Sequence, residues 1–97
     1  MRTILVFYFK YTDYKFFISL VPMEISVKIW KRKFISLVVN EDQTVEDIKN
    51  QIEDKESIQP KHQSLFFNGK PLENDRTLSD YMIKKDATLY LYLRGKF

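Results

Sequence analysis

The sequence predicts a small α+β roll with the element order ββαββ around one hydrophobic core. Three observations predict it. With 97 residues, the chain has room for one core and not for a second. Apolar residues alternate with polar ones in three short segments, 24–30, 33–39 and 88–93, which is the period of half-buried strands. Between the second and third segments, one stretch places its apolar residues at helical spacing instead.

The first two strands are predicted over residues 24–30 and 33–39, and Lys31-Arg32 joins them into a hairpin. Their inward side chains are Ile25, Val27, Ile29, Ile35, Leu37 and Val39. The turn is basic, with Lys28, Lys31, Arg32 and Lys33 close together in the sequence. Such a turn is either a solvated loop or a contact for an acidic or phosphate group.

The helix is predicted over residues 44–56, where Val45, Ile48 and Ile52 share one face. Thr44 can cap its first turn together with Asp47, three residues on. Pro60 disfavours helical geometry at the residue before it and so ends the helical stretch.

The second half of the chain is predicted to hold two further strands. Residues 64–72 read as a strand that runs into Asn68-Gly69, a signal for a type I′ turn. Thr77–Tyr81 reads as a short helical turn opened by a capping threonine. Residues 88–93 form the last alternating strand, with Tyr90 and Tyr92 on the face opposite the leucines.

Composition argues against a conventional enzyme, and we expect no cofactor and no metal. The chain has no cysteine, one histidine (His62) and two glycines. It therefore lacks the residues needed for a thiolate metal site, for a histidine-based metal or catalytic site, and for a glycine-rich loop that binds phosphate. Net charge is +3, but residues 1–22 carry three basic residues against one acidic residue. Residues 23–97 are therefore nearly neutral, which makes nucleic acid an unfavoured partner.

Residues 1–22 differ in character from the rest. Two aromatic-rich apolar runs, residues 4–9 and 16–21, flank a polar stretch. Each run is short for a signal peptide, no small-residue cleavage site follows, and charges interrupt any membrane-spanning helix. The composition favours two short strands that add to the edge of the strand at 33–39, although a targeting or membrane-anchoring segment stays open.

Residues 23–94 resemble ubiquitin through the stretches KNQIEDKESIQP, LFFNGKPLE, DRTLSDYMI and TLYLYLR, of which RTLSDY at 76–81 is the most specific. The resemblance implies the ubiquitin-like β-grasp fold, a mixed sheet packed on one helix. It assigns residues 23–97 to this domain and leaves 1–22 as an unrelated extension. Ser57 takes the place of the family's helix-ending glycine, so we expect it in a left-handed conformation.

The resemblance also implies a partner-binding patch on the exposed sheet face, at Trp30, Phe66, Gly69, Tyr90 and Tyr92. Every side chain in this set is aromatic, whereas the family's are mostly aliphatic. Outward aromatics also occur simply as strand formers. We expect a binding site for ubiquitin-binding domains, because several large aromatics on one small surface exceed ordinary exposure.

Two further features concern conjugation. Six of the family's acceptor lysines are present, namely Lys28, Lys33, Lys49, Lys55, Lys70 and Lys85, and Gln51 replaces the seventh. Of these, Lys70 and Lys85 are the favoured linkage sites. The tail has Leu93, Arg94 and Gly95, but Lys96-Phe97 follow in place of the family's Gly-Gly.

The sequence therefore predicts a monomeric, non-catalytic interaction module of the cytoplasm and nucleus that is not itself conjugated. Its expected partners are ubiquitin-binding domains and enzymes of the ubiquitin pathway. The alternative is a divergent ubiquitin unit or precursor that acts as a protein tag or chain acceptor through its lysines.

Overall fold

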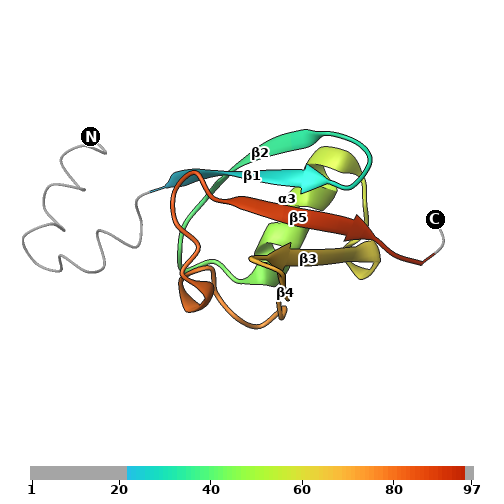
Figure 1. Cartoon of the computed structure of the whole chain (residues 1–97). Coiled ribbons are helices and arrows are strands. Elements are labelled where there is room, and N and C mark those ends of the chain that lie inside the picture. Colours follow the sequence, from blue (N-terminus) through green and yellow to red (C-terminus); the bar gives the residue numbers. More distant parts are fainter. Residues whose placement is uncertain (1–21, 96–97) are drawn as a thin grey trace, which may run out of the picture.

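The computed structural model describes residues 22–95, so the predictions for residues 1–21 and 96–97 lie outside the described part of the chain. A five-stranded sheet carries one long helix on one of its faces (Figure 1). The elements, in chain order, are β1 Met23–Ile29, β2 Phe34–Val39, α3 Val45–Glu56, the 3₁₀ helix η1 Pro60–His62, β3 Gln63–Phe67, β4 Lys70–Pro71, the 3₁₀ helix η2 Ser79–Tyr81 and β5 Thr88–Leu93.

The sheet is mixed and has the strand order β2-β1-β5-β3-β4. β1 pairs antiparallel with β2 and parallel with β5. β3 pairs antiparallel with both β5 and β4. A mixed sheet crossed by one helix confirms the β-grasp fold that the resemblance implied. The first and last strands of the domain lie side by side at the centre of the sheet.

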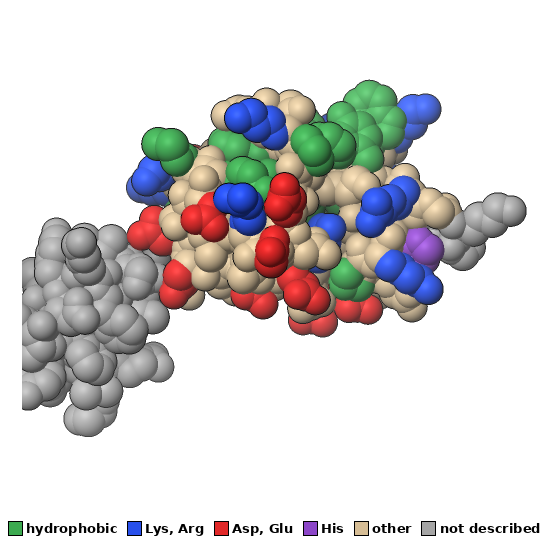
Figure 2. Space-filling model, turned by 90° about the horizontal axis from the view of Figure 1, so that it is seen from below, with side chains coloured by type: hydrophobic (Ala, Val, Ile, Leu, Met, Phe, Trp, Pro, Cys, Tyr) green, Lys and Arg blue, Asp and Glu red, His purple; other side chains and the backbone are tan. Residues whose placement is uncertain are grey.

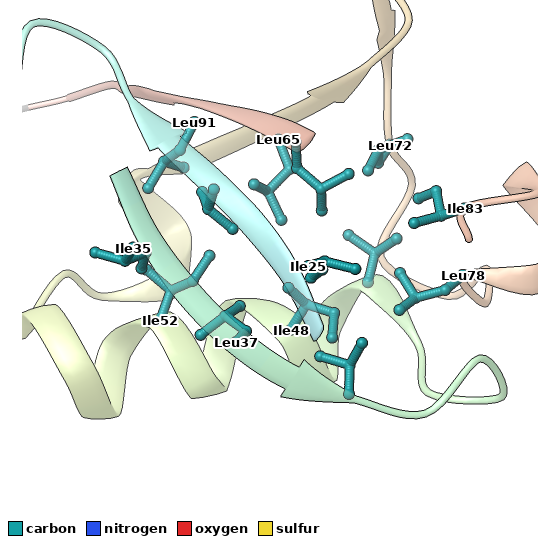
Figure 3. Close-up of a cluster of buried hydrophobic side chains, with 14 of the residues drawn as sticks. Ile25, Ile35, Leu37, Ile48, Ile52, Leu65, Leu72, Leu78, Ile83 and Leu91 are labelled. Atoms are coloured by element: carbon teal, nitrogen blue, oxygen red, sulfur yellow. The ribbon is translucent and has the colours of Figure 1, made fainter. Parts of the chain in front are cut away.

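The core lies between the sheet and α3 (Figure 3). Every second residue of β1, β2 and β5 is buried, and α3 contributes Val45, Ile48 and Ile52, as the alternation and the helical spacing predicted. Leu72, Leu78 and Ile83 close one end of this core from the loops between β4 and β5. Because alternate strand residues are used inward, the residues between them are turned to the other face of the sheet.

The ends of α3 are confirmed as predicted. At the first turn, the Asp47 backbone N–H donates to the Thr44 hydroxyl and the Thr44 N–H donates to the Asp47 carboxylate, both at 3.1 Å. At the last turn, Ser57 has φ 60° and ψ 33°, which is the left-handed region. Its N–H donates to the Glu53 carbonyl at 2.8 Å. A side chain in this conformation costs about 1 kcal/mol relative to glycine.

The stretch predicted as one strand over residues 64–72 is a tight hairpin of β3 and β4. Asn68 and Gly69 both have positive φ, 52° and 77°, which confirms the type I′ turn. A Cβ built on Gly69 would meet no atom within 4 Å. The glycine is therefore favoured here by its backbone angle and not by crowding.

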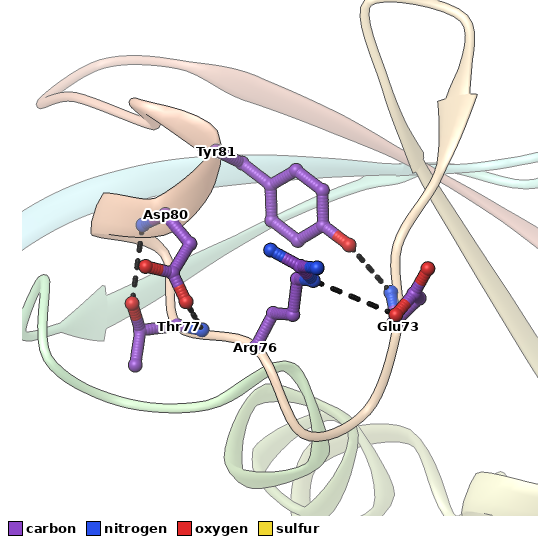
Figure 4. A network of polar contacts seen from close by, with 5 residues as sticks. All are labelled: Glu73, Arg76, Thr77, Asp80 and Tyr81. Atoms are coloured by element: carbon purple, nitrogen blue, oxygen red, sulfur yellow. Dashed lines mark hydrogen bonds and ion pairs between the residues drawn. The ribbon is translucent and has the colours of Figure 1, made fainter.

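The loop from β4 to η2 is held by side chains (Figure 4). The Asp80 N–H donates to the Thr77 hydroxyl at 3.1 Å, and the Thr77 N–H donates to the Asp80 carboxylate at 3.0 Å. This pair opens η2, so the helical turn predicted at Thr77–Tyr81 is present as a 3₁₀ helix. The Tyr81 hydroxyl accepts from the Glu73 N–H at 2.9 Å and fastens η2 to the chain leaving β4.

Between residues 22 and 95, no helix has the length and apolar character needed to cross a membrane.

Candidate functional site

The exposed face of the sheet carries a row of side chains that crosses four strands. Phe34 of β2 lies opposite Lys28 of β1, which in turn lies beside Tyr90 of β5. Tyr90 lies opposite Phe66 of β3, and Tyr92 lies opposite Ser64 in the same strand pair. Residues far apart in the sequence therefore meet on one surface because of the strand order.

The Tyr92 ring contacts two other aromatic rings in this region. The Trp30 and Tyr92 ring centroids are 5.5 Å apart, and those of Phe66 and Tyr92 are 5.4 Å apart with the rings nearly perpendicular. These are favourable aromatic geometries. Trp30 is 52% exposed, Tyr90 44% and Tyr92 38%, so much of this aromatic surface faces solvent.

The same residues line a shallow hollow of about 610 Å³, bounded by Ser64, Phe66, Gly69, Tyr90 and Tyr92. Four of the five predicted patch residues therefore meet at one hollow, and Trp30 joins through its contact with Tyr92. We call Trp30, Phe66, Gly69, Tyr90 and Tyr92 the aromatic patch. In Figure 2, hydrophobic side chains gather along the upper margin of the molecule and most acidic side chains lie below them.

Sequence reasoning left Phe34 out of this site. Phe34 is 62% exposed, and the Lys28 ammonium lies 4.8 Å from the centroid of its ring. The alternation in residues 33–39 already turned Phe34 outward. Its closeness to the aromatic patch follows only from the pairing of β2 with β1 and of β1 with β5.

The candidate acceptor lysines have different surroundings. Lys33 pairs with Glu56 at 3.2 Å, and the Lys55 ammonium donates to the Ser36 carbonyl at 2.7 Å. Lys70 and Lys85 are exposed and have no hydrogen bond or ion pair with any residue in the described range 22–95.

Lys49 is the exception, because its side chain is largely buried. It lies on the inward face of α3 beside Ile48 and Ile52 and is only 5% exposed. Burial lowers the pKa of Lys49, and the nearby Arg94 guanidinium lowers it further, while Glu46 acts in the opposite direction. An acceptor amine must reach an enzyme's active site, so we expect Lys49 to be modified less readily than the exposed Lys70 and Lys85.

The tail residues lie against the turn that precedes β3. The Arg94 N–H donates to the His62 carbonyl at 2.9 Å, and His62 Nδ1 lies 2.9 Å from the Arg94 carbonyl oxygen. Gly95 has φ 81°, and a Cβ there would come within 2.9 Å of the His62 ring. Leu93 is half-buried against the core. The structure therefore brings Arg94 and Gly95 against His62, whereas Leu93 lies opposite Gln63 in the strand pair of β3 and β5.

Within residues 22–95, no three histidine, cysteine or acidic side chains are grouped so that they could hold a metal ion. What the described surface offers is a set of contacting aromatic rings and exposed amines.

The fold and the aromatic patch together describe a β-grasp domain with exposed aromatic side chains on one face of its sheet. The chain belongs to the ubiquitin family, whose sequence pattern, described as "Ubiquitin family", it matches over residues 25–96.

Individual relatives agree with this assignment. The chain is 39% identical over 71 residues to the NEDD8-like protein RUB3 of Arabidopsis thaliana, a match that covers 73% of this chain and 91% of that protein. It is 35% identical over 71 residues to the ubiquitin-like protein NEDD8 of Dictyostelium discoideum, covering 73% and 92%. It is also 35% identical over 72 residues to the ubiquitin-like protein 4A of Rattus norvegicus, covering 74% of this chain but 46% of that protein.

Proposed function

We propose that this protein acts by being bound: ubiquitin-binding domains dock on the aromatic patch, and the chain itself performs no catalysis. The observation that supports this is the contact of Tyr92 with both Trp30 and Phe66, beside a hollow on the sheet face that Phe66 and Tyr92 line. Clustered, partly exposed aromatic side chains are typical of the centres of protein interfaces. The family's proteins act as modifiers or tags, which is the class of activity that such a surface serves.

The test is to replace Phe66, the ring at the wall of the hollow. Phe66→Ala should weaken binding to an isolated ubiquitin-binding domain by about 2 kcal/mol or more, which is about thirtyfold in Kd. Met82→Ala is the matched control, because Met82 is 72% exposed but lies outside the hollow. Equal affinities of both variants and the parent chain, measured by calorimetry on folded protein, would contradict the proposal.

The finer part of the proposal is that the chain is not conjugated through its tail. It is supported by the two hydrogen-bond contacts that hold the Arg94 backbone against His62. It is also supported by Lys96, which follows Gly95 where an activated tail has a second glycine. With ubiquitin-activating enzyme and ATP, the full chain should form no thioester. Replacing Lys96-Phe97 by Leu-Arg-Gly-Gly should restore charging, and a thioester formed by the unchanged chain would refute this part.

A second candidate function is that of a tag or chain acceptor. The exposure of Lys70 and Lys85, without partners in the described range, favours it. Incubation with ubiquitin and its conjugating enzymes, followed by mapping of modified lysines, tests it. Modification at Lys70 and Lys85 that is lost in Lys70→Arg and Lys85→Arg would support this function, and modification spread evenly over all lysines would argue against it.

The cytoplasmic and nuclear location stays a prediction, and imaging of the tagged full chain tests it.

A further inference from the structure

Lys49 is a lysine whose side chain is largely buried while its ammonium still reaches solvent. It is 5% exposed, and its ammonium makes no hydrogen bond or ion pair with the residues of the described part of the chain. The ammonium therefore lies at the edge of an open hollow, where it can exchange water for a carboxylate. Burial of the side chain and the neighbouring Arg94 lower the pKa of Lys49, while Glu46 acts in the opposite direction.

Gln63 lies beside it and is also incompletely satisfied. Its side-chain amide donates to the Lys49 carbonyl at 2.9 Å and to the Ile58 carbonyl at 2.8 Å. Its Oε1 atom is buried and accepts no hydrogen bond. The Gln63 side-chain amide therefore lies against the backbone of Lys49 and can report on changes there.

Both side chains line a second hollow, of about 520 Å³, which also includes Asn74 and Arg94. Two cations therefore border this hollow. The carboxylate on its wall, Glu73, is largely exposed and lies 3.5 Å from the Arg76 guanidinium, which partly offsets its charge. The hollow shares Ser64 and Phe66 with the hollow of the aromatic patch, so the two lie next to each other on the surface.

We propose that this second hollow binds a carboxylate, and that its natural occupant is an aspartate or glutamate side chain of the protein docked on the aromatic patch. The identity of the occupant rests on the proposed function, because the partner must already lie over Phe66. A carboxylate gives the Lys49 ammonium an ion-pair partner, which it lacks within residues 22–95, and Arg94 provides a second positive charge beside it. The expected partner is therefore a ubiquitin-binding domain that has an apolar side chain for the aromatic patch and an acidic residue next to it.

Acetate is the probe, and the full chain is the sample. Titrating acetate against chloride at constant ionic strength should shift the Gln63 side-chain amide signal in NMR in a saturable way. It should also raise the pKa of Lys49, because the anion stabilises the charged amine. Lys49→Met should abolish the saturable shift. Lys55→Met should not, because Lys55 lies on the same helix but donates to the Ser36 carbonyl outside this hollow.

Two results would overturn the proposal. One is a shift that stays linear in acetate, or that persists in Lys49→Met, since either means that no site centred on Lys49 exists. The other is saturation by inorganic phosphate without saturation by acetate, which would mean an anion site of the wrong chemistry.

A second arm separates this inference from the proposed function. With a ubiquitin-binding domain that carries an acidic residue beside its apolar contact, Lys49→Met should weaken binding about tenfold or more. If Phe66→Ala weakens binding and Lys49→Met does not, the proposed function stands and the partner assignment fails. If acetate saturates the site but Phe66→Ala binds normally, the patch function fails while the carboxylate site stands.

Discussion

Gln63 is a fully buried polar residue, and its replacement tests the packing described above. It has no exposed surface, and its amide joins α3, through the Lys49 carbonyl, to the linker after it, through Ile58. Gln63→Ala removes two hydrogen bonds worth about 1 kcal/mol each. It also leaves a void at a fully buried site, which adds about 1–2 kcal/mol. We therefore expect the free energy of unfolding to fall by about 3–4 kcal/mol.

For a domain of this size such a loss lowers the melting temperature by about 15 °C or more. Thermal and urea unfolding followed by circular dichroism measure it. Gln63→Leu fills most of the volume but leaves the Ile58 carbonyl unpaired, so it should lose about 1–2 kcal/mol. Gln59→Ala is the matched control, because Gln59 is exposed and its side chain makes no capping hydrogen bond. If Gln63→Ala unfolds within about 0.5 kcal/mol of Gln59→Ala, the two hydrogen bonds do not contribute as argued.

Three further outcomes are expected. Ser57→Gly should stabilise the domain by about 1 kcal/mol in chemical unfolding, because glycine adopts the left-handed conformation at lower cost; a loss of stability would contradict the cap geometry. Thr44→Ala should cost about 1 kcal/mol through loss of the cap, whereas Thr88→Ala, outside the cap, serves as comparison. Lys49→Met should be more stable than the parent by about 1 kcal/mol at neutral pH. This difference in stability should shrink as pH rises from the lowered pKa of Lys49 in the folded chain toward the ordinary value of 10.5. In that range the unfolded parent chain binds more protons than the folded one, so the parent gains stability as pH rises. A stability difference that does not change with pH would contradict this expectation.

Local patterns in the sequence were sufficient to predict most elements. Alternation placed the strands to within a residue or two, because one face of each strand must be apolar to reach the core. The cap pair Thr44 and Asp47, the left-handed Ser57 and the turn at Asn68 are set by near neighbours along the chain, and each was predictable for that reason. The patch residues followed from the same alternation once the family resemblance supplied the strand order.

Contacts between distant segments were not predictable from local patterns. The parallel pairing of β1 with β5 joins strands about sixty residues apart, and no periodicity specifies it. Lys49 was treated as a surface lysine, although its spacing from Val45 and Ile52 places it on the buried face of α3. The position of Lys49 on the helix therefore determines its burial, even though its side chain is charged. The partly unpaired amide of Gln63 and the contacts of His62 with Arg94 likewise depend on the tertiary arrangement.

The edge of β2 bears on the prediction that residues 1–22 add strands there, a prediction that lies outside the described residues. The Ser36 and Val38 carbonyls accept hydrogen bonds from the Lys55 ammonium and from the Gln51 amide, at 2.7 and 3.1 Å. Their backbone groups therefore point away from β1, and α3 already occupies two of the acceptors that an added strand would use. Gln51, which replaces the seventh of the family's acceptor lysines, therefore still donates a hydrogen bond to β2, although an amide cannot serve as an acceptor amine.

An added strand must compete with those two side chains for the carbonyls, but the outward N–H groups of β2 stay available to it. If the strand adds, deleting residues 1–22 should speed amide exchange at Phe34, Ser36 and Val38. The alternate amides, at Ile35 and Leu37, point toward β1 and should be unaffected. Replacing Gln51 by alanine in the full chain should slow exchange at the outward amides further, since it frees the Val38 carbonyl. Equal exchange at outward and inward positions before and after the deletion would show that residues 1–22 do not pair with this edge, because pairing can protect only the groups that face it.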